Sequence, residues 1–200
     1  MTPTLPLNID AEFKTKREKA RRNLMWLALG SMIMIFAGLT SAYVVRKGGG
    51  DWFSIVLPQV FWISSAVIIL SSVTMNIAVA GYRKNNQQQG VIYVGITFLL
   101  GLLFAFFQFR GYQELTENGI YFVPSKGQTS LISGSFIYVL SGLHLAHLAG
   151  GLIALAFIFV KGMIGKYRPA MLQSVRVAAI YWHFLDFLWI YLFVFLTIFK

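Results

Sequence analysis

Residues 177–199 read VAAIYWHFLDFLWIYLFVFLTIF, an apolar run in which Asp186 is the only Asp, Glu, Lys or Arg. A carboxylate at the centre of a membrane helix costs about 2.5–3.5 kcal/mol on insertion scales. The surrounding Leu, Ile, Val and Phe each contribute roughly −0.3 to −0.6 kcal/mol, so together they outweigh this cost. We therefore predict a membrane-spanning helix in which Asp186 faces protein or a water-filled cavity.

The rest of the chain has the same character, with 57% apolar and only 12% charged residues. A soluble domain carries about 25% charged residues. The apolar runs are continuous rather than alternating, which favours helices over a β-barrel. A span needs about 20 residues, and five runs are long enough. We predict an all-α polytopic membrane protein, a bundle of five transmembrane helices at about 24–45, 57–82, 91–109, 130–160 and 177–199.

Residues 1–23 form a polar tail that ends in a basic cluster. The apolar run after it shows no small-residue cleavage site, so we expect a retained membrane helix rather than a signal peptide. Of the 17 Lys and Arg, 12 fall in this tail and in the loops after the second and fourth runs, and 5 on the other side. The positive-inside rule then places the N-terminus in the cytoplasm and the C-terminus outside.

The net charge of +10 is explained by basic loops that meet anionic lipid headgroups, and we expect no nucleic-acid partner. Arg168, Arg176 and Trp182 are the candidate headgroup contacts. The chain has no Cys, which excludes thiolate ligands, disulfides and thiol chemistry.

Small and weakly polar residues recur along each run and predict helix–helix contacts, because small residues let helices approach closely. The first run has Ser31, Gly38 and Ala42, and the second has Ser65, Ser72 and Asn76. The third has Thr97, Gly101, Ala105, Gln108 and Tyr112. Gln108 is interpreted as a helix-contact residue rather than a substrate ligand.

The titratable residues fall in the last two runs. His144 and His147 are three residues apart and share a helix face, as do His183 and Asp186. At about 1.5 Å rise per residue, Asp186 and His147 lie at comparable depth in two neighbouring antiparallel helices. A His–Asp pair between these helices is therefore a prediction.

Residue types alone leave several readings of these histidines open. They could bind copper or another metal, since neutral imidazole is a good ligand. A haem could lie between two facing helices, although His144 and His147 cannot ligate one iron from opposite sides. A proton path through Asp186 is the third reading. The fourth is a buried polar cluster that holds helices together.

Two longer motifs carry a family resemblance. Residues 181–189, YWHFLDFLW, resemble the Tyr-Trp-His-Phe-x-Asp-x-x-Trp sequence of subunit III of the haem–copper oxidases of the cytochrome c oxidase type. Residues 134–147 are similar to that family's Gly-x-His-x-x-His helix. Weaker matches lie at residues 36–43 and 71–74 and at Gln108 with Tyr112. The resemblance covers nearly all of the chain after residue 24 and points to the short, five-helix bacterial form.

The resemblance implies a non-catalytic accessory subunit of a proton-pumping terminal oxidase in the bacterial cytoplasmic membrane. Such a subunit packs on subunit I, supports proton uptake and durability during turnover, and holds phospholipid in a cleft. It binds no metal, because the haems and copper belong to subunits I and II. Subunit IV and a respiratory supercomplex are further candidate partners. The resemblance thus favours a structural polar cluster of His144, His147, His183, Asp186 and Gln108.

Three alternatives remain: subunit III of a quinol oxidase, a stand-alone transporter or proton channel, and a haem-bearing membrane oxidoreductase. One departure from the family also matters. Members often carry a Glu in the first of these helices, and here Met32 stands at that position. Asp186 is then the only acid in any predicted span, so a role of the missing Glu is not carried over.

Overall fold

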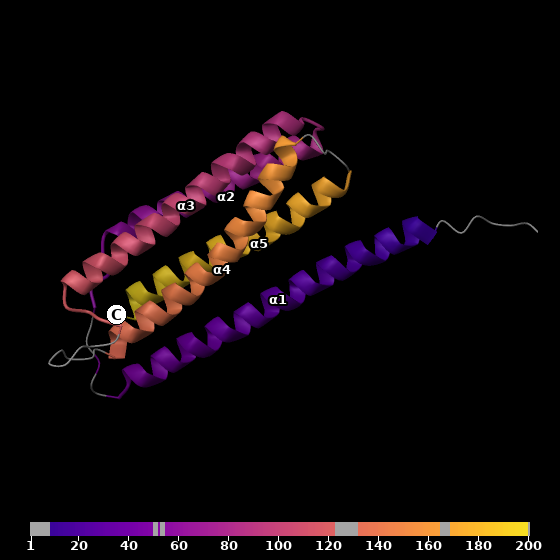
Figure 1. Ribbon diagram of the computed structural model, residues 1–200. Coiled ribbons are helices and arrows are strands. Elements are labelled where there is room, and N and C mark those ends of the chain that lie inside the picture. The colour runs from indigo at the N-terminus through magenta and orange to yellow at the C-terminus, as the bar shows by residue number, and fades with distance from the viewer. Residues whose placement is uncertain (1–8, 50–51, 53–54, 123–131, 165–168, 200) are drawn as a thin grey trace, which may run out of the picture.

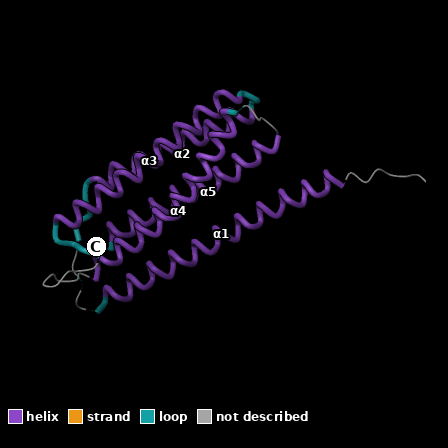
Figure 2. Tube along the Cα trace, viewed as in Figure 1, coloured by secondary structure: helices purple, strands orange, loops and turns teal. Residues whose placement is uncertain are grey.

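The computed structural model describes residues 9–49, 52, 55–122, 132–164 and 169–199, and these fold into five long helices (Figures 1 and 2). They are α1 (Ile9–Lys47), α2 (Val60–Arg83), α3 (Gln87–Glu117), α4 (Ile132–Met163) and α5 (Pro169–Ile198). Each contains a segment long and apolar enough to cross a membrane, and the described residues include no strand. The predicted all-α bundle of five transmembrane helices is confirmed.

Four of the five helices are longer than the apolar runs that predicted them, whereas α2 begins at Val60, three residues after the start of its predicted run. α1 begins at Ile9, inside the segment that we assigned to the polar tail, and α3 continues to Glu117. α5 begins at Pro169, because proline is well suited to a first helical position. The added turns contain Lys, Glu, Gln and Ala, which favour helix whether or not they lie in a membrane.

α2 and α3 form a tight antiparallel hairpin. Asn85 in the turn adopts φ 61°, and the Asn86 side chain accepts a hydrogen bond from the Gln89 backbone N–H at 3.1 Å, which caps α3. Gly81 and Gly90 lie where the helices meet. A Cβ on Gly81 would lie 3.0 Å from the Gly90 nitrogen, so the close approach requires glycine.

α5 is the central helix of the bundle. It packs against α2, α4 and α1, and 56% of its membrane segment is buried, compared with 28–33% for the other four. In the described part of the chain, α1 packs only on α4 and α5 (Figure 1). The segment that carries Asp186 therefore crosses the interior of the protein.

α1 attaches to the bundle through large side chains. Its buried face carries Met25, Leu29, Met32 and Phe36. The predicted contact stripe at residues 31, 38 and 42 is wrong, because these positions are exposed. The Ser31 hydroxyl bonds instead to backbone carbonyls of its own helix.

An aromatic cluster fastens the C-terminal end of α1. The Tyr43 ring packs edge-on against Trp52, Phe136 and Phe195, with ring centroids 4.6–5.6 Å apart. Its hydroxyl donates to the Phe199 carbonyl at 3.0 Å. This end of α1 is thus held to both α4 and α5.

Candidate functional site

The polar interior of the bundle is organised by serines on α2. The Ser71 and Ser65 hydroxyls accept the indole N–H of Trp182 and Trp189 on α5, at 3.0 and 2.9 Å. Each serine also donates its own hydroxyl proton to a carbonyl one turn earlier on α2. Both indoles are buried, so these bonds fix how α5 is rotated against α2.

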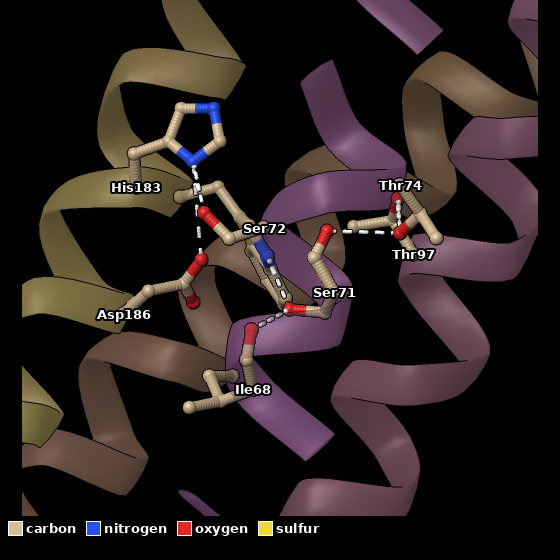
Figure 3. Close-up of polar contacts among 8 residues, drawn as sticks. Ile68, Ser71, Ser72, Thr74, Thr97, His183 and Asp186 are labelled. Carbon is tan, nitrogen blue, oxygen red and sulfur yellow. Dashed lines mark hydrogen bonds and ion pairs between the residues drawn. The ribbon is translucent and has the colours of Figure 1, made fainter. Parts of the chain in front are cut away.

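Asp186 and His183 face α2 at Ser72, next to Ser71 (Figure 3). The His183 Nδ1 lies 2.6 Å from the Ser72 hydroxyl and 3.9 Å from Asp186 Oδ2. Asp186 is only 5% exposed, and neither carboxylate oxygen has a hydrogen-bond partner within the described ranges. The expectation that Asp186 faces protein rather than lipid is confirmed.

The polar contacts continue from α2 into α3. The Thr74 hydroxyl lies 2.8 Å from both the Thr97 hydroxyl and the Ser71 carbonyl (Figure 3). Polar side-chain contacts thus join α5 to α2 and α2 to α3 at neighbouring positions of α2. Interhelical bonds of this kind contribute on average about 0.6 kcal/mol each in membrane bundles.

Gln108 is the helix-contact residue that the sequence predicted. Its Nε2 donates to the Ser64 hydroxyl on α2 at 3.0 Å. One turn further along α3, the Tyr112 hydroxyl donates to Ser141 on α4 at 3.0 Å. Both residues join α3 to its neighbours.

The two histidines of α4 lie in different environments. His144 is buried against the rings of Phe104 and Trp189, and its nitrogens have no hydrogen-bond partner among the described residues. His147 Nδ1 lies 2.8 Å from the Leu143 carbonyl of its own helix, and its ring packs near Phe36 of α1.

The predicted His–Asp pair between α4 and α5 is therefore wrong. The acid lies next to His183 on its own helix and faces α2. The five residues assigned to one polar cluster lie in separate places: His183 with Asp186, Gln108 beside Ser64, and His144 and His147 in two further settings. Equal depth did not bring the side chains together, because depth says nothing about rotation around the helix axis.

The three residues predicted to contact lipid headgroups lie in different environments. Trp182 is wrong in this role, because it is 1% exposed and its N–H bonds to Ser71 in the interior. Arg176 is exposed near the start of α5. Arg168 lies outside the described residues.

A largely apolar cleft of about 670 Å³ opens between α1, α4 and α5. On α1 it is lined by residues 24–28, near the start of the membrane segment of that helix, and on α5 it reaches Tyr181. Arg176 immediately precedes the lining residue Val177 on α5. The lining comes from three helices: Leu24, Met25, Ala28, Gly150, Gly151, Ala154, Phe157, Ile158, Gln173, Ser174, Val177, Ala178 and Tyr181.

Over the described ranges, no three His, Cys, Asp or Glu side chains lie close enough to hold a metal ion. Aromatic rings pack against the His144 imidazole, and neighbouring oxygens engage Nδ1 of His147 and of His183. The arrangement is suited to holding helices in register.

The sequence did not predict Ser64 as a contact residue, and it singled out Ser71 only within the weaker family match at residues 71–74; both serines carry interhelical bonds. A signal was present, because serine pairs occur at 64–65 and 71–72, seven residues apart and hence on one helix face. Of these serines, the predicted contact stripe of this helix contains only Ser65 and Ser72, because it takes one residue from each turn of the helix.

Comparison with known proteins agrees with this picture. The family model of cytochrome c oxidase subunit III matches residues 49–200. A probable cytochrome c oxidase subunit 3 of Mycobacterium bovis is 34% identical over 176 residues, which cover 85% of this chain and 82% of the relative. Quinol oxidase subunit 3 of Bacillus spizizenii is 29% identical over 197 residues, covering 93% and 91%. Cytochrome bo(3) ubiquinol oxidase subunit 3 of Pseudomonas aeruginosa is 30% identical over 179 residues, covering 84% and 79%. This multi-pass membrane chain belongs to the cytochrome c oxidase subunit III family.

Proposed function

We propose that the chain is a non-catalytic accessory subunit of a proton-pumping terminal oxidase in aerobic respiration. Family membership supports the complex, and the placement of the polar residues supports the accessory role. The main support for the proposal is that titratable and amide side chains of this chain lie at contacts between its helices. Asp186 and His183 meet Ser72, and Gln108 bonds to Ser64.

Haems and copper would reside in the partner subunits I and II, with subunit I in direct contact with this chain. The placement of His144 supports this division, because its imidazole is enclosed by the rings of Phe104 and Trp189 and no group of three metal-ligating side chains occurs among the described residues. Subunit IV and a respiratory supercomplex are the further partners in this proposal. The bacterial relatives support the bacterial cytoplasmic membrane as the location.

Cytochrome c is the electron donor that we favour, since the family model and the relatives from Mycobacterium are described as cytochrome c oxidase subunits. A quinol oxidase is the alternative, because two relatives carry that description. A purified oxidase that oxidises reduced cytochrome c but not a quinol analogue supports the first choice, and the reverse preference supports the second.

The cleft between α1, α4 and α5 is the proposed phospholipid site. Its lining is largely apolar, which suits acyl chains, and the exposed Arg176 beside it suits an anionic headgroup. Lipid held there would keep α1 against the bundle while the oxidase turns over.

The proposal is tested by purifying the affinity-tagged chain from native membranes in mild detergent. We expect haem-bearing and copper-binding subunits to co-purify and the eluate to reduce oxygen. Recovery of the chain without a haem-bearing partner would contradict the proposal.

Asp186→Ala tests the supporting role more closely. We expect the assembled oxidase to keep its initial rate of oxygen reduction and to lose activity faster during continuous turnover, because the substitution removes the carboxylate beside His183, the α5 residue that contacts Ser72 of α2. An oxygen electrode records both quantities. Complete loss of the initial rate in a fully assembled complex would contradict this expectation.

A stand-alone proton channel is the second candidate, favoured by the buried, unbonded carboxylate of Asp186 beside His183. Asp186→Asn distinguishes the channel from the accessory subunit, since it keeps the size of the side chain and removes the titratable carboxyl group. Proton flux through liposomes that contain only this chain, abolished by Asp186→Asn, would favour the channel.

A further inference from the structure

Four helices meet in the interior of the bundle around the Trp189 indole. Gln108 of α3 donates to the Ser64 hydroxyl of α2, and Trp189 of α5 donates to the next hydroxyl of α2, that of Ser65. The Trp189 ring also packs against His144 of α4, with ring centroids 5.4 Å apart. Side chains of four helices thus meet in one junction, formed by Ser64, Gln108, His144 and Trp189.

Two contacts between α3 and α4 bracket Gln108. The Phe104 ring lies 6.0 Å from the His144 ring, measured between centroids, and Gln108 follows four residues later on the same face of α3. One further turn along α3, Tyr112 donates to Ser141, which lies one turn from His144 on α4. Gln108 therefore lies between two contacts that α3 makes with the same stretch of α4, within about one turn of His144.

Both side chains carry polar atoms that the bundle leaves without hydrogen bonds. Each side chain belongs to a residue that is 1% exposed. Among the described residues, Gln108 Oε1 and both ring nitrogens of His144 have no hydrogen-bond partner. The Ser64 hydroxyl cannot supply the donor, because it accepts from Gln108 and donates to the Phe61 carbonyl. Buried polar groups that lack a protein partner are usually satisfied by ordered water.

The unbonded atoms suit a single water molecule. The imidazole of His144 offers at least one N–H donor in either protonation state, and Gln108 Oε1 is an acceptor. One water can accept from the first and donate to the second, and it needs only about 10–15 Å³ of free volume. The low exposure of both residues excludes a lipid headgroup. No group of three His, Cys, Asp or Glu among the described residues favours a metal ion instead.

We propose that this junction of α2, α3, α4 and α5 binds an ordered water molecule. The water accepts a hydrogen bond from a ring N–H of His144 and donates one to Gln108 Oε1. Through the Gln108–Ser64 bond it connects α4 with α2, two helices that do not pack directly on each other in the described part of the chain. The site needs no partner subunit, so it is independent of the proposed function.

Electron cryomicroscopy of the complex purified from native membranes, at a resolution that shows ordered water, tests the inference. We expect density about 2.7–3.2 Å from a ring nitrogen of His144 and from Gln108 Oε1. His144→Phe removes both nitrogens, so the density is expected to be lost although Gln108 stays. Thr97→Val is the matched control, because it removes a different interior contact, that with Thr74, and is expected to leave the density in place.

Three results would overturn the inference. The first is a direct hydrogen bond between His144 and Gln108, which leaves no atom for the water to bridge. The second is an empty junction in a map that shows ordered water elsewhere in the complex. The third is density that persists in His144→Phe, since other groups would then hold it.

Thermal unfolding of the chain in the purified complex gives a second measurement. Gln108→Met keeps the length of the side chain and removes its amide. We expect it to lower the unfolding temperature about half as much in the His144→Phe background as in wild type, because the bridge is already lost. Thr97→Val lies eleven residues, or about 16 Å, from Gln108 along α3, and is expected to cause the same shift in both backgrounds. Equal shifts of Gln108→Met in the two backgrounds would contradict the bridge.

Discussion

Ser71 is one of the two serines of α2 that accept an indole N–H from the central helix. Its hydroxyl accepts the Trp182 N–H at 3.0 Å and donates to the Ile68 carbonyl. Ser71→Ala leaves a buried indole N–H without an acceptor, which costs about 1–3 kcal/mol. We expect the chain in the purified oxidase to unfold at a lower temperature, as measured by thermal denaturation.

Ser31→Ala is the matched control for this prediction. The Ser31 hydroxyl is exposed and bonds only within α1, to the carbonyls of Leu27 and Ala28. Its loss is expected to leave the unfolding temperature nearly unchanged. Equal shifts for the two variants would show that the indole bond does not stabilise the bundle.

At the level of residues, the sequence predicted which side chains lie at helix contacts better than it predicted the residues that they contact. Asp186 and Gln108 were expected at protein contacts and are found there. Trp182 was assigned to headgroups because tryptophan is common at membrane interfaces, whereas a serine on α2 lets it lie in the interior. Partner choice depends on how each helix is rotated, and spacing within one helix does not contain that information.

Gly101 marks the contact of α3 with α4 and α5. A Cβ placed on it would lie 2.6 Å from the Trp182 ring and 2.8 Å from Leu152. Gly101→Ala therefore forces α3 outward or displaces a buried indole, and overpacking of this kind costs about 1–3 kcal/mol. We expect a lower unfolding temperature of the chain in the assembled oxidase.

The control for this element is Gly38→Ala on the exposed side of α1, where no atom lies within 4 Å of the added carbon. The same substitution there is expected to be neutral. A Gly101→Ala oxidase as stable as the Gly38→Ala oxidase would contradict the close packing of α3.

At the level of elements, the number and order of helices followed from the uncharged runs, but their ends did not. Hydropathy marks where a helix is apolar, whereas the hydrogen-bonded backbone continues as long as local residues permit. The first residues of α3 show this, since Asn86 caps a polar turn that precedes the apolar run. The predicted contact stripe of α1 failed for another reason: that helix packs through large side chains.

For the whole molecule, orientation remains a prediction from the positive-inside rule. The chain has no Cys, so single cysteines introduced at Gly48 and Asn85 report on opposite loops. We expect a membrane-impermeant maleimide to label Gly48→Cys in spheroplasts and to leave Asn85→Cys unlabelled until the membrane is broken. Labelling of Asn85→Cys in sealed spheroplasts would invert the proposed topology.

At the scale of the oxidase, we propose that the chain stabilises the complex and performs no redox step. The most direct test is to remove the chain from the purified oxidase with detergent and to record haem content and oxygen reduction before and after removal. We predict that the haem stays with the remaining subunits, that the initial rate persists, and that activity then decays faster during turnover. Haem that leaves with the chain, or oxygen reduction that stops as soon as the chain is removed, would contradict the account.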